Sequence, residues 1–334
     1  MKRKPNVALT MPSSLRKRLF DRENTQALRA VAGKVVAHTK DGKAQLKDLA
    51  RLLKDAEVVI SSWGSPCITA EALAVAPKLR LICHAAGTVK GVVSDAVWKR
   101  GIRVTSAASA IAVAVAETAL GCMITGMKDI FRIRGKLQKG LAWWEARQGS
   151  REMYRKTIGI IGASHVGRYV IRLLDGFDVT ILLYDPYVSA AKANKLGVTK
   201  VTLPRLLRES DIVSLHAPST DETRHMLGAK AFRMMKDDAL FINTARGAII
   251  DEKALIRELK KGRFFAFLDV TDPEPPKKGH PFYRLDNVVL TPHIAGTVDD
   301  VTPLGKLAIE EVERFSQGKK PLYPVTRRML SHIG

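Results

Sequence analysis

In the stretch "TIGIIGASHVGR" at residues 157–168, a short apolar run leads through a glycine turn into the start of a helix. That order is typical of the strand, turn and helix that open a Rossmann domain, where a G-x-G-x-x-G pattern brings phosphates to the helix N-terminus. The three positions are Gly162, Ser164 and Gly167, so a serine replaces the middle glycine. The backbone approaches a pyrophosphate most closely there, and a side chain either obstructs the ligand or helps to hold it.

Apolar runs and helical stretches alternate from Thr157 onward, as a parallel sheet with crossover helices requires. The later runs are "VTILLYDP", "DIVSLHAP", "ALFINTA", "FFAFLDV" and "NVVLTPHIA", and each ends in polar or turn residues. Open α/β sheets bind ligands at the C-terminal ends of their strands, so functional groups should gather at these ends.

The N-terminal part repeats this alternation without a phosphate-binding fingerprint. We expect strands in "VVI", "LRLICHAAGT" and "IRVTSAAS", and helices around 43–54, 69–76 and 92–100. A helical period over 298–317, with a kink or a late start at Pro303, could return to this part.

A chain of 334 residues with a hydrophobic content of 46% can bury a substantial core. Its length exceeds the size at which a single core usually stops growing. We predict two doubly wound, Rossmann-like α/β domains. Residues 1–106 with 297–334 would form a flavodoxin-like substrate-binding domain, and residues 107–296 a nucleotide-binding Rossmann domain.

The formal charge of +22, from 55 Lys and Arg against 33 Asp and Glu, raises nucleic acid or a membrane surface as partners. The basic residues are spread along the chain, and no run of five or six like charges occurs. We therefore expect no specific nucleic-acid partner, but a solvated basic surface that steers small anions.

Cys67, Cys83 and Cys122 form no C-x-x-C pair, which is typical of a reduced protein without disulfides or a metal site.

The apolar stretch from Ser109 to Met127 approaches the length of a membrane span, but it carries Glu117 and many small residues. We expect a close-packed helix and no membrane association. The N-terminal residues include no apolar signal region, so we expect a cytoplasmic protein.

Asp185 ends the second strand after the glycine turn, about 20 residues on, where a carboxylate binds ribose hydroxyls. It would repel a 2′-phosphate, which favours NAD over NADP; the alternative is a turn residue before Pro186. Ser164 could keep its backbone near the phosphates and add a hydroxyl donor. The amides of His165 and Val166 would begin the helix at its positive dipole end.

Three downstream motifs resemble those of the D-isomer-specific 2-hydroxyacid dehydrogenases, a family that includes glyoxylate and hydroxypyruvate reductases and phosphoglycerate dehydrogenases. The motifs are "INTARGAIIDEKAL" (242–255), "FLDVTDPEP" (267–275) and "LTPHIAG" (290–296). With the glycine turn, "YDP" and "LHAPSTDET", the resemblance covers nearly the whole chain. It implies that Arg246 binds the substrate carboxylate and polarises the carbonyl, that His293 is the acid/base, and that Glu274 orients and charges it.

These residue types also suit the chemistry. Reduction of a 2-keto acid needs a hydride, a proton for the developing alkoxide, and a fixed cation for the carboxylate. Histidine supplies a proton near neutral pH, and a carboxylate partner favours its charged form. Arginine presents a planar fork to a carboxylate. Taken singly, each could instead be an ordinary surface or loop residue.

The resemblance further implies contacts to substrate and cofactor. The amides of Ala86, Gly87 and Thr88 would face the substrate carboxylate, although an ordinary turn after the strand explains this glycine nearly as well. Trp63 would wall the acyl pocket, or else pack in a core. Thr223 resembles the family's loop threonine, although it could instead cap a helix. The expected NAD contacts are Gly162, Ser164, His165, Val166, Gly167, Asp185, Ala217, Pro218, Thr223, Thr244, Ala245, Asp269 and Gly296.

Two departures from the family pattern bear on the substrate and on regulation, and one further segment bears on the state of association. Residues 58–70 contain no Lys or Arg, so we expect no phosphate clamp and a small unphosphorylated acid such as glyoxylate or hydroxypyruvate. The chain ends soon after Lys320, so we expect no regulatory domain of the kind attached to many phosphoglycerate dehydrogenases. "LAWWEARQG" at 141–149 corresponds to the family's dimerisation arm, and its tryptophans suit a homodimer interface.

Several function classes compete with a reductase. Formate or phosphite oxidation is a neighbouring reaction, but formate offers no alkoxide for Glu274 and His293 to protonate. A non-catalytic NAD-sensing protein is an alternative, because the family's transcriptional corepressors resemble this fold. Nucleic-acid binding is supported only by the charge and by no recognisable motif.

Overall fold

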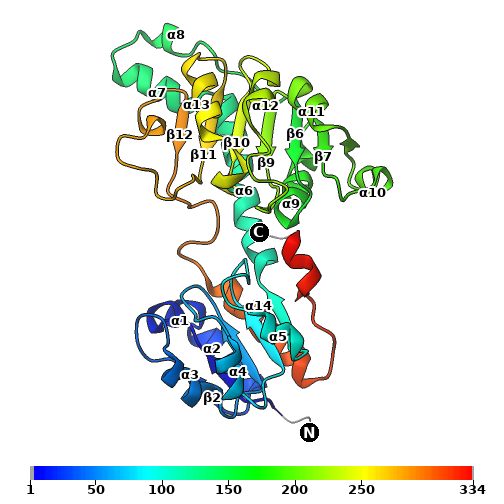
Figure 1. Ribbon diagram of the computed structural model, residues 1–334. Coiled ribbons are helices and arrows are strands. Elements are labelled where there is room, and N and C mark those ends of the chain that lie inside the picture. The colour runs from blue at the N-terminus through cyan, green and yellow to red at the C-terminus, as the bar shows by residue number, and fades with distance from the viewer. Residues whose placement is uncertain (1–3, 333–334) are drawn as a thin grey trace. The chain divides into compact units, whose positions relative to one another are not determined.

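The computed structural model describes residues 4–332 and divides into two compact units (Figure 1). The first comprises Met1–Ile111 with Thr297–Gly334, and the second Ala112–Gly296. The division falls inside helix α6 (Ala108–Met127), a few residues beyond the border expected from the sequence.

The sheet of the first unit has the strand order β13-β5-β4-β3-β1-β2. All neighbours are parallel except β13, which pairs antiparallel with β5. The order of β1 to β5 is the flavodoxin-like one, which confirms the predicted fold class. The bounds are β1 (Val7–Leu9), β2 (Val35–Ala37), β3 (Val58–Ser61), β4 (Leu81–His84), β5 (Arg103–Ser106) and β13 (Pro324–Val325).

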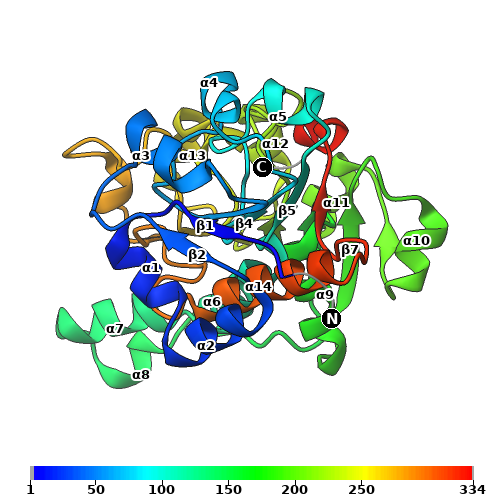
Figure 2. The same ribbon diagram turned by 90° about the horizontal axis from the view of Figure 1, so that it is seen from below.

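Helices cover both faces of this sheet (Figure 2). Alternate strand residues point to opposite faces, so Val59 packs beneath α3, α4 and α5 while Val58 and Ile60 pack beneath α1, α2 and α14. α14 begins at Thr302 with Pro303 in its first turn, so the late start is the correct alternative. The bounds are α1 (Ser13–Leu19), α2 (Arg22–Val31), α3 (Leu46–Leu53), α4 (Ala70–Ala74), α5 (Asp95–Lys99) and α14 (Thr302–Ser316).

The sheet of the second unit is parallel throughout, in the order β12-β11-β10-β9-β6-β7-β8. This is the Rossmann order with β12 added beside β11, and β6 is the strand quoted above. The bounds are β6 (Thr157–Ile161), β7 (Thr180–Tyr184), β8 (Thr199–Lys200), β9 (Ile212–Leu215), β10 (Leu240–Asn243), β11 (Phe265–Leu268) and β12 (Val288–Leu290).

One face of this sheet packs against α6, α9 and α10, and the other against α11, α12 and α13. α7 and α8 follow α6 and bury few side chains. The bounds are α7 (Ile130–Gln138), α8 (Trp143–Ala146), α9 (His165–Leu173), α10 (Ala190–Lys195), α11 (Leu203–Glu209), α12 (Ala229–Met234) and α13 (Glu252–Lys260).

α6 is the one helix in residues 4–332 that is long and apolar enough to cross a membrane by length and composition. Ala116, Ala119 and Met123 are fully buried in the second unit's core. Val113 and Ile124 are 37% and 41% exposed. The expected close packing therefore holds for one face of α6 only.

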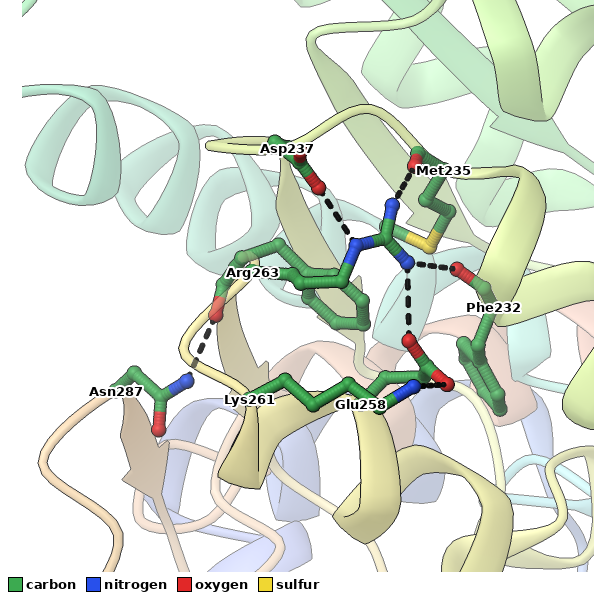
Figure 3. Close-up of polar contacts among 8 residues, drawn as sticks. Phe232, Met235, Asp237, Glu258, Lys261, Arg263 and Asn287 are labelled. Atoms are coloured by element: carbon green, nitrogen blue, oxygen red, sulfur yellow. Dashed lines mark hydrogen bonds and ion pairs between the residues drawn. The ribbon is translucent and has the colours of Figure 1, made fainter.

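A polar network centred on Arg263 fixes α12 and α13 to the edge where β11 begins (Figure 3). Its guanidinium donates to Asp237 at 2.6 Å, to Glu258 at 3.0 Å and to the Met235 carbonyl at 2.6 Å. The hydrogen-bonded Lys261 ammonium, with Arg263, lowers the pKa of the Glu258 carboxyl. This network stabilises the scaffold whose opposite edge carries the candidate site.

Candidate active site

The glycine turn after β6 runs directly against the end of β9, at the point where the strand order reverses. Gly162 has φ +94°, and a Cβ there would lie 2.7 Å from the Ala217 Cα. A Cβ on Gly167 would lie 2.0 Å from the Gly162 carbonyl oxygen. Only glycine fits at either position, so strand, turn and helix pack as in a phosphate-binding loop.

Ser164 is the N-cap residue of α9, but its side chain forms no capping bond. Its hydroxyl donates to the His216 carbonyl at 3.0 Å. The hydroxyl thus ties the glycine turn to the end of β9, whereas the sequence suggested a donor for phosphate. The amides of His165, Val166 and Gly167 have no hydrogen-bond partner within residues 4–332, as expected for a first helical turn.

His216 is a buried residue beneath this turn that the sequence did not single out. Its Nε2 lies 2.8 Å from the Ser214 hydroxyl, while Nδ1 has no partner in the described part of the chain. Burial lowers the pKa of His216 to about 3, so the imidazole is neutral. A neutral ring adds no charge beneath the turn, whose Ala163 carbonyl accepts from the Arg168 guanidinium at 2.8 Å.

Asp185 accepts hydrogen bonds from the Ala163 amide and the Tyr187 amide, both at 2.8 Å. It therefore holds the glycine turn and does more than form a turn before Pro186. A cavity of about 630 Å³ adjoins it, and two cations line this cavity. Arg205 is paired with Glu209 at 2.9 Å, and Lys200 donates to the Val188 carbonyl.

The ends of β10, β11 and β12 bring the predicted catalytic residues to one edge of the sheet. Asn243 is opposite Leu268 in the register, and Leu268 is opposite Leu290. Arg246 follows β10 and His293 follows β12 by three residues each, and Glu274 lies in the loop after β11.

Gly247 brings the Arg246 loop against the Glu274 loop. A Cβ on Gly247 would lie 2.1 Å from the Thr271 carbonyl carbon and 2.6 Å from the Asp272 amide nitrogen. Buried Asn243 fixes the turn, since it accepts from the Ala245 amide at 3.0 Å and donates to the Arg246 carbonyl at 3.1 Å. Neither residue was predicted as part of the site, although an asparagine at a strand end and an Arg-Gly pair are both visible in the sequence.

Arg246 itself is exposed. Its guanidinium donates to the Ala245 carbonyl at 2.6 Å and forms no ion pair with any carboxylate of residues 4–332. The remaining donors of this fork are free for an anionic ligand.

His293 Nδ1 lies 2.7 Å from Glu274 Oε1, so the predicted pair is formed. Both side chains are partly exposed, 46% for His293 and 40% for Glu274. With Nδ1 engaged by the carboxylate, Nε2 is the nitrogen left to exchange a proton with a ligand.

Asp269 shapes the turn that carries His293. Its main-chain carbonyl accepts from the His293 amide at 2.9 Å. Its carboxylate, nearly fully buried, accepts from the Thr291 hydroxyl at 2.6 Å, the Ile294 amide at 2.8 Å and the Ala295 amide at 2.9 Å. Oδ2 accepts only the Ala295 bond and retains a lone pair, so the NAD contact expected of Asp269 remains a prediction.

A cavity of about 460 Å³ opens beside this pair, with mostly apolar walls. Its lining includes Asp269, Thr271, Glu274, Tyr283, Leu290 and Pro292. Cavities of this size suit small ligands.

Two threonines, Thr223 and Thr244, are among the predicted cofactor residues of the second unit. Thr223 donates to the Pro218 carbonyl at 2.6 Å, and the next helix begins only at Ala229, so the helix-cap alternative is wrong. The buried Thr244 hydroxyl has no partner in the described residues. Gly296 follows Ala295 at the end of the His293 turn.

The predicted substrate residues lie in the first unit, after the ends of β3 and β4. The amides of Ala86, Gly87 and Thr88 have no partner within residues 4–332, while the Ser106 hydroxyl donates to the Ala86 carbonyl at 3.1 Å. Trp63 is 43% exposed in the loop after β3, so core packing is the wrong alternative for it. The amides and the ring stay predicted substrate contacts.

Comparisons with known proteins agree with this geometry. The model of the D-isomer specific 2-hydroxyacid dehydrogenase NAD binding domain matches residues 120–295. A glyoxylate reductase of Korarchaeum cryptofilum is 34% identical over 80% of this chain and 82% of its own. A hydroxypyruvate reductase of Thermotoga maritima is 32% identical over 89% of this chain and 94% of its own. The chain belongs to the D-isomer-specific 2-hydroxyacid dehydrogenase family.

Two further similarities concern phosphoglycerate enzymes. A D-3-phosphoglycerate dehydrogenase of Methanocaldococcus jannaschii is 34% identical over 82% of this chain, which spans about half (52%) of that protein. The crystal structure of a phosphoglycerate oxidoreductase from Rhizobium etli has a TM-score of 0.83 at 26% identity, covering 97% of this chain and 99% of that one.

The residues present fit NAD, the cofactor of the matched domain. Gly162 and Gly167 form a cradle that any Cβ would fill, and the buried Thr244 hydroxyl lacks a partner among the described residues. Within residues 4–332, no group of three or more His, Cys, Asp or Glu side chains could hold a metal ion.

Proposed function

We propose that the protein is an NAD-dependent dehydrogenase that interconverts a small 2-keto acid and its D-2-hydroxy acid. The observation that carries this proposal is the contact of 2.7 Å between His293 Nδ1 and Glu274 Oε1 beside the Arg246 loop. A proton donor next to a free guanidinium suits a substrate with a carbonyl beside a carboxylate.

The side chains take the following parts. NADH, when bound, supplies the hydride to C2 of the keto acid. His293 gives the Nε2 proton to the developing alkoxide, and Glu274 holds the ring and stabilises its charged form. Arg246 binds the carboxylate and the carbonyl oxygen, and the unpartnered amides of Ala86, Gly87 and Thr88 bind the carboxylate. In the opposite direction His293 accepts the hydroxyl proton.

The glycine turn, the first amides of α9 and Thr244 hold the dinucleotide, and Asp185 accepts from the adenosine ribose. We propose NAD over NADP because a 2′-phosphate would meet the Asp185 carboxylate. Arg205 and Lys200 are already engaged by Glu209 and a main-chain carbonyl.

The substrate is a small unphosphorylated acid, with glyoxylate and hydroxypyruvate as the first candidates. Residues 58–70, which include Trp63, contain no Lys or Arg to neutralise a substrate phosphate. Two relatives are named for these substrates, as glyoxylate and hydroxypyruvate reductases.

We also propose a homodimer formed through α7 and α8. Trp143 and Trp144 are 69% and 67% exposed, and α7 has no buried residue. Large exposed aromatic side chains on adjacent elements are typical of a protein interface.

Oxidation of NADH and NADPH, followed by absorbance over a panel of 2-keto acids, tests the proposal. We expect turnover of at least one small acid and a clear preference for NADH. Equal efficiency with NADPH would contradict the role of Asp185. Tight NADH binding without turnover of any acid would favour the second candidate, a non-catalytic NAD-sensing protein.

A further inference from the structure

A groove with four basic side chains lies between α1 and α2 of the first unit. Its volume is about 490 Å³, and its lining includes Arg16, Lys17, Phe20, Asp21, Arg22 and Arg29. Arg22 and Arg29 are seven residues apart on α2, a spacing that puts both on one helix face. Arg16 and Lys17 come from the last turn of α1, so two helices supply the charge.

The basic side chains that line this groove outnumber its one acidic side chain, Asp21. None of the four cations forms an ion pair in residues 4–332, whereas neighbouring Arg18 pairs with Asp299 at 3.9 Å. Asp21, the carboxylate of the groove, caps α2 by accepting from the Asn24 amide at 2.8 Å. The groove therefore has an excess of cations.

Arg16 provides a second observation. Its Nε is buried and has no hydrogen-bond partner in the described residues, and its Nη2 makes one long bond of 3.4 Å to the Ser13 hydroxyl. The described residues therefore leave most donors of the Arg16 guanidinium unused.

We propose that this groove binds a compact anion with two or more phosphate groups. Arginine forks match phosphate oxygens, and two helices supply cations for more than one group. The volume suits a small ligand. Phe20, the one aromatic residue in the lining, is 7% exposed and cannot stack on a base. The phosphates of such a ligand therefore provide the recognition.

This groove lies within the first unit, whereas the glycine turn of the proposed cofactor site belongs to the second. A nucleic-acid backbone carries the same phosphates, so the test must distinguish the two sources.

Calorimetric titration of the whole protein with inorganic tripolyphosphate tests the proposal. We expect saturable binding that Arg22→Gln with Arg29→Gln weakens by roughly tenfold or more. Lys47→Gln with Lys54→Gln, an exposed lysine of α3 and the exposed lysine that follows its end, removes the same charge and should leave binding nearly unchanged. NADH binding should persist in every variant as a check of folding.

Three outcomes would overturn the proposal. One is the absence of saturable binding to the wild type, and another is an equal loss in both double variants. The third is a short duplex DNA that binds more tightly than tripolyphosphate and is lost with Arg22→Gln and Arg29→Gln, which would assign the groove to nucleic acid.

Discussion

Ser164 shows how one residue can keep a phosphate-binding turn in shape with a different interaction from the usual one. A glycine at this position gives space to the ligand, whereas this serine gives its hydroxyl to the His216 carbonyl at 3.0 Å. The side chain points toward the protein in this contact, so the turn keeps its free amides for the ligand. The substitution is therefore compatible with a working site.

We expect Ser164→Gly to bind NADH as tightly as the wild type or somewhat more weakly, because one neutral hydrogen bond worth about 1 kcal/mol is lost. Ser164→Ala, which keeps the Cβ, should lose a similar amount. Ser164→Val should bind much more weakly because of its bulk. Calorimetric titration compares the four proteins, and clearly tighter binding by Ser164→Gly would mean that the serine damages the site.

His216 predicts a particular dependence of stability on pH. Burial lowers the pKa of His216 from the ordinary value of 6.5 to about 3. The unfolded chain therefore takes up a proton at this residue first, and the free energy of unfolding falls as the pH drops from 6.5 toward 3. Between pH 6 and 5 the free energy of unfolding of His216→Gln should fall less steeply than that of the wild type, by up to about 1.4 kcal/mol per pH unit.

Urea unfolding at several pH values measures this difference. His225→Asn is a matched control, because His225 is exposed and has a positive φ that asparagine tolerates. The free energy of unfolding of His216→Gln should fall less steeply than that of this control variant as well. Parallel curves for His216→Gln and the wild type would contradict a buried neutral imidazole.

At the level of elements, the loops that follow β10 and β11 approach each other closely because Gly247 has no side chain. We expect Gly247→Ala to lower kcat/KM by about 10²-fold, because its Cβ would collide with the backbone at Thr271 and shift Arg246 relative to Glu274. NADH binding should change little. Steady-state kinetics with the best keto acid measures the effect.

Gly176→Ala is the matched control, since a Cβ there meets nothing within 4 Å. It should keep the wild-type activity and melting temperature. If Gly247→Ala were as active as this control, the close approach of the two loops would have no part in positioning Arg246.

The elements were predictable from the sequence where a long pattern defines them. The Rossmann strands carry apolar runs with polar ends, and the motifs around Arg246, Glu274 and His293 fixed one edge of the sheet. β1 and β2 were missed because each is three residues long and too short to show a period. The contacts of Gly247, His216 and the Ser164 hydroxyl depend on tertiary approach, which spacing along the chain does not show.

At the scale of the whole molecule, the exposed tryptophans predict the state of association. We expect the wild type to be a dimer and Trp143→Ser with Trp144→Ser to dissociate, because buried aromatic anchors dominate most interfaces. Light scattering after size-exclusion chromatography measures the mass, and NADH binding by the variant checks its folding. A monomeric wild type, or a variant that stays dimeric, would contradict this interface.

In the proposed reaction His293, held by Glu274, supplies the proton for reduction of a keto acid. The most direct measurement is kcat for wild type and His293→Ala with the best acid of the panel, with NADH affinity measured alongside. We predict a loss of about 10² to 10⁴ in kcat with NADH affinity retained, because a positioned proton donor contributes that much. A kcat for His293→Ala close to that of the wild type would mean that His293 is not the proton donor.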